Sequence, residues 1–117
     1  MKKDTVFNIG KKEYSIAFTN RDLAKMERSI GRSLLSMFGG TGNHLVEAMT
    51  IDVMASAVVC GVKDLGKEDP YDFIQRYCDE GGDIDSFGGI VLDALLATGL
   101  FTRGKAARKV EKAPDKP

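Results

Sequence analysis

Residues 4–18 read DTVFNIGKKEYSIAF, and this stretch decides the fold because apolar and polar residues alternate on both sides of a glycine. The alternating apolar residues are Phe7, Ile9, Tyr14, Ile16 and Phe18. A period of two residues is typical of strands that bury one face. Gly10 lies between the two runs and can adopt the positive φ that a tight connection requires. The stretch therefore predicts a β-hairpin.

The hairpin needs a cover, because two strands alone are marginally stable in water. Its apolar face must pack on helices of the same chain or on a strand of another chain. Helical spacing of apolar residues follows at once, with Thr19 and Asn20 available as capping residues and Gly31 as the stop of the first helix. A second, short helix is predicted over 33–38, before the glycine-rich residues 39–42.

Three longer helices are predicted after residue 42. The first covers about residues 44–65, with Asn43 as its cap and Gly66 as its stop. The next begins at Asp69-Pro70, because aspartate caps a helix and proline fits its first turn, and it closes at Glu80-Gly81-Gly82. Asp83 or Asp85 opens the last helix, which runs to about Phe101.

Two of these helices, 44–65 and the one that ends near Phe101, are apolar around most of their circumference, which is typical of central core helices. The predicted fold class is α+β and mainly α, with an N-terminal β-hairpin packed on a bundle of four to five helices. Residues 1–101 are expected to form one domain. Residues 102–117 lose the apolar periodicity and predict a flexible basic tail.

The composition is that of an ordinary globular protein. The chain has 117 residues, of which 43% are hydrophobic and 29% charged, and its formal net charge is zero. Cys60 and Cys78 are predicted to be reduced thiols, since no CxxC pair is present. With His44 as the single histidine, the sequence predicts no metal site, no cofactor and no catalytic centre. Neither a secretion signal nor a membrane span is predicted, so a cytoplasmic location is expected.

Charge is divided along the chain. Residues 1–101 hold 11 basic and 15 acidic side chains, whereas residues 102–117 hold six basic and two acidic ones. The basic tail could contact nucleic acid, but it lacks aromatic residues, so a solubilising or partner-recruiting role is favoured. Nine acids lie within residues 64–93. They are interpreted as helix caps and a solvated face, with a docking face for a basic partner as the alternative.

Two helices that are apolar nearly all round and a hairpin that needs a cover indicate an excess of apolar surface, which favours an oligomer or partner surface over a purely internal core. Methionine side chains would help such a surface adapt to varied apolar ligands. The predicted partner-binding residues are Phe7, Ile9, Tyr14, Ile16, Leu34, Leu35, Met37, Phe38, Leu100 and Phe101. The alternative is that all of them belong to the chain's own core.

The order of these parts resembles the tail assembly chaperones of long-tailed phages, prophages and gene transfer agents. The resemblance covers roughly residues 5–101 and is one of layout and of the style of the opening. The stretches that carry it are FNIGKKEY at 7–14, IAFT at 16–19, LAKME at 23–27, IG at 30–31, DPY at 69–71 and LL at 95–96. It implies no catalytic residues, because that family has none to transfer.

The resemblance implies a protein that binds the tape measure protein and keeps this long helical chain soluble until tail tube subunits polymerise around it. It also implies a longer form made by ribosomal frameshifting, and absence from the mature virion. The edge of the hairpin is expected to support a homo-oligomer, since an unpaired strand is a template for pairing. The alternatives are a nucleic-acid-associated or regulatory protein of a phage or mobile element that acts through the basic tail, and a structural tail or connector component.

Overall fold

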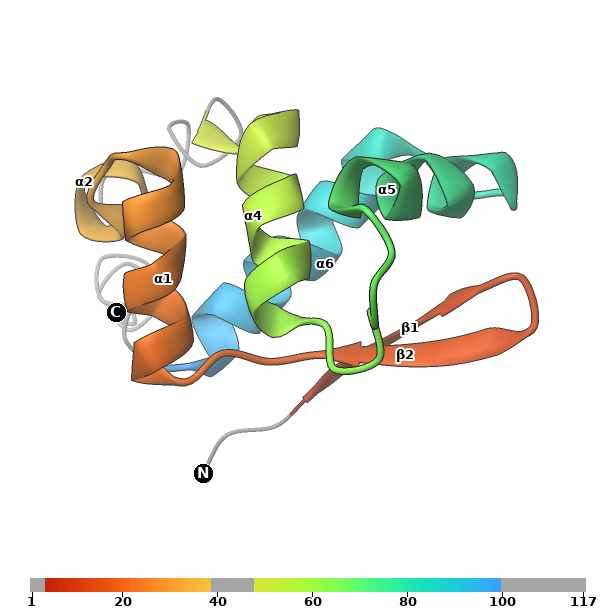
Figure 1. Ribbon diagram of the computed structural model, residues 1–117, viewed down its shortest axis with the longest axis horizontal. Helices are drawn as coiled ribbons and strands as arrows, with labels where there is room; N and C mark the ends of the chain where they lie inside the picture. Colours follow the sequence, from red (N-terminus) through yellow and green to blue (C-terminus); the bar gives the residue numbers. More distant parts are fainter. Residues whose placement is uncertain (1–3, 39–47, 100–117) are drawn as a thin grey trace, which may run out of the picture.

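The computed structural model describes residues 4–38 and 48–99, and Figure 1 shows how their elements are arranged. A two-stranded antiparallel hairpin at the N-terminus packs against five helices, so the predicted α+β, mainly α, fold class is confirmed. The elements are β1 (Thr5–Ile9), β2 (Lys12–Ile16), α1 (Asn20–Ile30), α2 (Leu34–Phe38), α4 (Ile51–Gly61), α5 (Pro70–Asp79) and α6 (Ile84–Ala97). The predicted tail, residues 102–117, lies outside the described residues.

The hairpin has the predicted strands and the predicted turn. Gly10 and Lys11 form the two-residue connection, and Gly10 has a φ of 61°. The paired residues are Thr5 with Ile16, Val6 with Ser15, Phe7 with Tyr14, Asn8 with Glu13 and Ile9 with Lys12. One face of the hairpin is therefore apolar, and it faces the helices of the same chain.

An aromatic cluster joins the hairpin to α5 and α6. The ring of Tyr14 meets that of Phe73 edge to face at a centroid distance of 5.1 Å. Phe7 meets Phe87 in the same manner at 5.8 Å, and Tyr77 lies 5.0 Å from Phe87. Edge-to-face packing of this kind stabilises beyond simple burial, by about 0.5–1.5 kcal/mol for each pair. The hairpin is thus covered by α5 and α6 and not by another chain.

The outer edge of β2 is covered by residues 61–63, which are the last residue of α4 and the two residues that follow it. The amide of Ala17 donates to the carbonyl oxygen of Gly61 at 3.1 Å, and the amide of Lys63 donates to the carbonyl oxygen of Ser15 at 3.2 Å. Figure 1 shows the end of α4 descending onto the strands at this point. These bonds satisfy backbone groups that a bare edge would leave to solvent.

The prediction of one helix over 44–65 is wrong in both of its bounds. In the structure α4 begins at Ile51, because the side chain of Thr50 accepts a hydrogen bond from an amide of the first turn. It ends at Gly61, since the residues that follow bond to β2 instead of continuing the helix. Gly66, the predicted stop, has a φ of 65° in the turn beyond. Asn43, the predicted cap, lies outside the described residues.

The start of α5 is as predicted. Asp69 caps it and Pro70 lies in its first turn. Asp83, not Asp85, caps α6 through a hydrogen bond from the Ser86 amide at 2.7 Å. The predicted end of α6 near Phe101 is too late, because the helix closes at Ala97 and Gly99 follows with a φ of 79°.

Candidate functional site

Six of the ten predicted partner-binding side chains lie inside the chain's own core. Each of them exposes 6% of its surface or less. They are Phe7, Ile9, Tyr14, Ile16, Leu34 and Met37. In the isolated chain, α5, α6 and the other helices cover these side chains, so their contact with a partner stays a prediction. Alternation of apolar residues identifies a buried face without identifying which chain buries it.

The remaining four residues divide between the surface and the part of the chain that is not described. Leu35 of α2 is 55% exposed and is thus the one that the structure leaves open to a partner. The side chain of Phe38 lies outside the described residues, as do Leu100 and Phe101.

Large apolar side chains that the structure does expose come from several elements. They are Val6, Leu35, Ile51, Val59, Tyr71 and Ile84. Single exposed apolar residues are normal on a protein surface and by themselves indicate nothing. Ile84 differs from the others because it lines an apolar groove, which makes this groove the candidate site.

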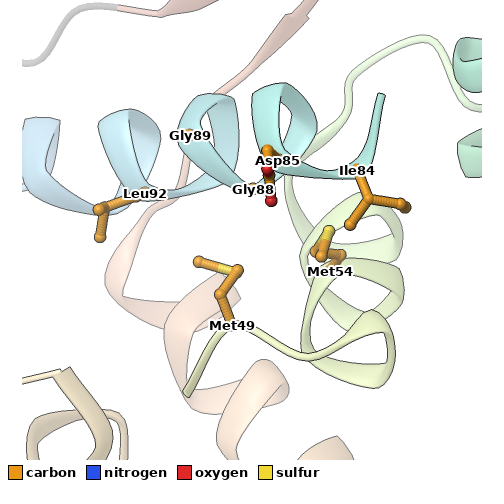
Figure 2. A pocket seen from close by; sticks show the side chains of 7 residues that line it. All are labelled: Met49, Met54, Ile84, Asp85, Gly88, Gly89 and Leu92. Atoms are coloured by element: carbon orange, nitrogen blue, oxygen red, sulfur yellow. The ribbon is translucent and has the colours of Figure 1, made fainter. Parts of the chain in front are cut away.

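The groove lies between the segment that leads into α4 and the first turns of α6, and its volume is about 380 Å³. Met49 and Met54 form one wall, and Ile84 and Leu92 of α6 form the other. Figure 2 shows the two methionine side chains directed toward α6. Asp85 supplies the acidic group among the lining residues. The candidate site is therefore an apolar groove with one acidic side chain.

Two consecutive glycines of α6 leave room for the groove. A β-carbon on Gly88 would lie 3.2 Å from Cγ of Met49, whereas a β-carbon on Gly89 would meet no atom within 4 Å. A glycine inside a helix costs roughly 0.5–1 kcal/mol relative to alanine. The pair thus lowers the helix propensity of α6 and leaves a gap where two side chains would stand (Figure 2).

The groove is suited to bind apolar side chains and offers no chemistry beyond that. Methionine side chains are flexible and polarizable, so they adapt to ligands of varied shape. An amphipathic helix that lays its apolar face in a groove is a common mode of peptide recognition. Within residues 4–38 and 48–99, no three His, Cys, Asp or Glu side chains lie close enough to hold a metal ion.

A second cavity, of about 330 Å³, lies among the end of α1, α2 and the start of α4. Arg32, Asp52 and Tyr71 give it a more polar lining than the groove has. The hydroxyl of Tyr71 donates to Oδ1 of Asp52 at 2.9 Å, and this hydrogen bond raises the pKa of Tyr71. Polar groups that already pair with each other make this cavity a poorer site for apolar side chains.

Several of the acids within residues 64–93 have a structural explanation, as the sequence predicts. Asp69 and Asp83 cap α5 and α6. Glu68 accepts two hydrogen bonds from the guanidinium of Arg76, at 2.8 and 3.1 Å. The alternative, a docking face for a basic partner, stays a prediction.

Both cysteines are free thiols. Burial raises the pKa of Cys60, the charge of Asp22 raises it further, and the charge of Lys25 opposes both effects. A raised pKa lowers the thiolate fraction and with it the nucleophilicity. His44 lies outside the part of the chain that the structure describes.

Sequence reasoning missed the groove residues. The available signal was the Gly88-Gly89 pair inside an apolar helix, which indicates a missing stretch of side-chain surface. No helix in the described ranges is both long and apolar enough to cross a membrane.

Comparisons of the chain with protein-family models, with curated proteins and with solved structures yield no match. The resemblance to tail assembly chaperones therefore stays a prediction.

Proposed function

We propose that this protein is a phage tail assembly chaperone, which binds the tape measure protein and keeps it soluble until tail tube subunits polymerise around it. The observation that supports this proposal is the apolar groove between Met49, Met54 and α6. A long helical client chain presents apolar stripes along its length, and each stripe needs a cover before assembly. The groove supplies such a cover for a few side chains at a time.

The mechanism follows from the size of the groove. A volume of about 380 Å³ accepts a short part of a helix face, so each contact is weak and readily reversed. Many copies along one client chain still hold it firmly, because linked sites raise the overall avidity. Weak single contacts also suit release, since tube subunits can displace the copies one after another.

One charged group lines the groove. Asp85 lies in the groove itself and favours a client helix with a lysine or arginine beside its apolar ridge.

Co-expression with the tape measure protein tests the proposal. The measurement is the fraction of the tape measure protein that stays in the supernatant. We expect the wild-type chain to increase this fraction, and we expect Ile84→Gln and Gly89→Leu to abolish the increase. Val59→Gln is the matched control, because Val59 is an exposed apolar residue of α4 that does not line the groove. No increase with the wild-type chain, or equal effects of Ile84→Gln and Val59→Gln, would contradict the proposal.

The protein content of purified virions distinguishes a chaperone from a structural component. A chaperone leaves when the tube forms, so we expect the protein to be absent from purified virions, whereas a tail or connector component remains in them. A salt titration of DNA binding addresses the regulatory alternative. Binding that weakens steeply with salt would favour a nucleic-acid-associated protein that acts through the basic tail.

A further inference from the structure

The two edges of the hairpin differ in their hydrogen bonds to the rest of the chain. Residues 61–63 bond to the outer edge of β2 through Ser15 and Ala17. Among the described residues, none donates or accepts a hydrogen bond at the outer edge of β1. The hairpin therefore has one covered edge and one open edge.

The register identifies the backbone groups on the open edge. Because the connection has two residues, Ile9 and Lys12 form a hydrogen-bonded pair, and such pairs alternate along an antiparallel ladder. The N–H and C=O groups of Val6 and Asn8 must then point away from β2. The same alternation directs Ser15 of β2 and Ala17, which follows β2, away from β1, and the structure shows both bonded to residues 61–63.

We propose that β1 pairs antiparallel with β1 of a second copy of this chain, about a two-fold axis at Phe7. In this register Val6 of each copy lies opposite Asn8 of the other. Both residues direct their backbone groups outward, so each of the two symmetry-related pairs exchanges an N–H···O bond in both directions. The two hairpins become one four-stranded sheet, and the open edges disappear.

Charge complementarity selects a second copy as the occupant. Asp4 begins the strand and Lys11 lies in the turn, and both are exposed. In the proposed register Asp4 of one copy lies opposite Gly10 of the other and beside its Lys11. The two-fold axis repeats this pairing at the other end of the strand. Within the described part of a single chain neither side chain forms an ion pair, so both are available.

Val6 supports the pairing from the solvent face of the strand. Its side chain is β-branched and apolar, yet 54% of it is exposed. A neighbouring strand would cover part of it.

The inference goes beyond the proposed function and does not depend on it, because pairing of β1 with β1 is independent of any client. A dimer would carry two grooves, and paired sites raise avidity for a repetitive client.

The molar mass of the full chain, measured by sedimentation over a range of concentrations, tests the proposal. We expect a monomer–dimer equilibrium. Asp4→Lys alone and Lys11→Asp alone should each weaken the dimer about tenfold, since each places like charges at both ends of the paired strands. An equimolar mixture of these two variants should recover wild-type affinity, because one copy then carries lysine at both positions and the other carries aspartate.

A backbone variant provides an independent test. Val6→Pro removes an outward N–H and leaves the bonds between β1 and β2 in place, so it should yield a folded monomer. Val6→Thr, which keeps the N–H, should still dimerise. Should Val6→Pro fail to fold by circular dichroism, the mixing experiment alone decides. A wild-type chain that stays monomeric, or a dimer that neither the charge reversals nor their mixture affects, would overturn the proposal.

Discussion

The guanidinium of Arg76 in α5 donates a hydrogen bond of 2.9 Å to the hydroxyl of Tyr14 in β2, although the two residues are 62 positions apart. The same group donates to Glu68 and lies 5.4 Å from the ring centroid of Phe73. The hydrogen bond to Glu68 raises the pKa of Arg76 most, and the hydrogen bond to Tyr14 raises it further. Arg76 thereby fastens the hairpin to the helix that covers it.

Removing the Tyr14 hydroxyl tests this connection. Tyr14→Phe keeps the ring in the aromatic cluster and leaves one guanidinium hydrogen bond unmade, so we expect the free energy of unfolding to fall by about 1 kcal/mol. Urea denaturation measures it. Tyr71→Phe is the control, because its hydroxyl also bonds a side chain but does so at the surface. A loss as large in the control as in Tyr14→Phe would contradict the expected role of Arg76.

Two glycine substitutions should act in opposite directions. A β-carbon at Gly61 would lie 2.5 Å from Cε1 of Phe18 and 2.9 Å from Cγ1 of Ile16, so Gly61→Ala forces the core apart and should destabilise by about 1–3 kcal/mol. Gly89→Ala meets no atom within 4 Å and should stabilise by about 0.5–1 kcal/mol through helix propensity. Thermal unfolding of both variants compares them. A stabilised Gly61→Ala would show that the contact with Phe18 relaxes freely.

The cap of α5 should matter more than its neighbouring charge. Oδ1 of Asp69 accepts hydrogen bonds from the amides of Tyr71, at 2.8 Å, and Asp72, at 3.2 Å. Asp69→Ala should therefore lower the free energy of unfolding by about 1 kcal/mol. Asp72→Ala removes a carboxylate from the same first turn without removing a cap, and should cost only about 0.3 kcal/mol. Chemical denaturation distinguishes the two, and equal losses would show that charge alone stabilises this helix end.

The thiol of Cys60 should react slowly and with an unusual pH dependence. Burial and the charge of Asp22 disfavour the thiolate and raise its pKa, so the rate of alkylation should keep rising at a pH where an ordinary cysteine has levelled off. The Cys78→Ser chain isolates this thiol for measurement by mass spectrometry. Lys25→Ala removes an opposing positive charge and should shift the profile to still higher pH. An unchanged profile in Lys25→Ala would exclude that charge as a cause.

The fold could largely be predicted because its signals are local. Alternation over residues 4–18 predicts the hairpin, and Asp69-Pro70 predicts the start of α5. The helix over 44–65 could not be bounded in the same way. A helix that is apolar on most sides contains no internal mark of its ends, and α4 stops at Gly61 because of hydrogen bonds to β2, which are made between distant parts of the chain.

The site escaped prediction for a related reason. Phe7, Ile9 and their neighbours are apolar because the hairpin has an inner face, and the sequence does not say whether helices of the same chain or a partner will cover it. The groove has room because Gly88 and Gly89 have no side chains. It also depends on Met49 and Leu92 lying together, which only the packing of α4 and α6 brings about.

The aromatic cluster has a consequence for how the molecule is made. Translation delivers the hairpin before α5 and α6, so Phe73 and Phe87, which cover Phe7, leave the ribosome later than β1 and β2. A nascent chain that has not yet released α5 and α6 holds β1 and β2 with their apolar face bare. The core can therefore be completed only after α6, the last helix of the described part, has been synthesised.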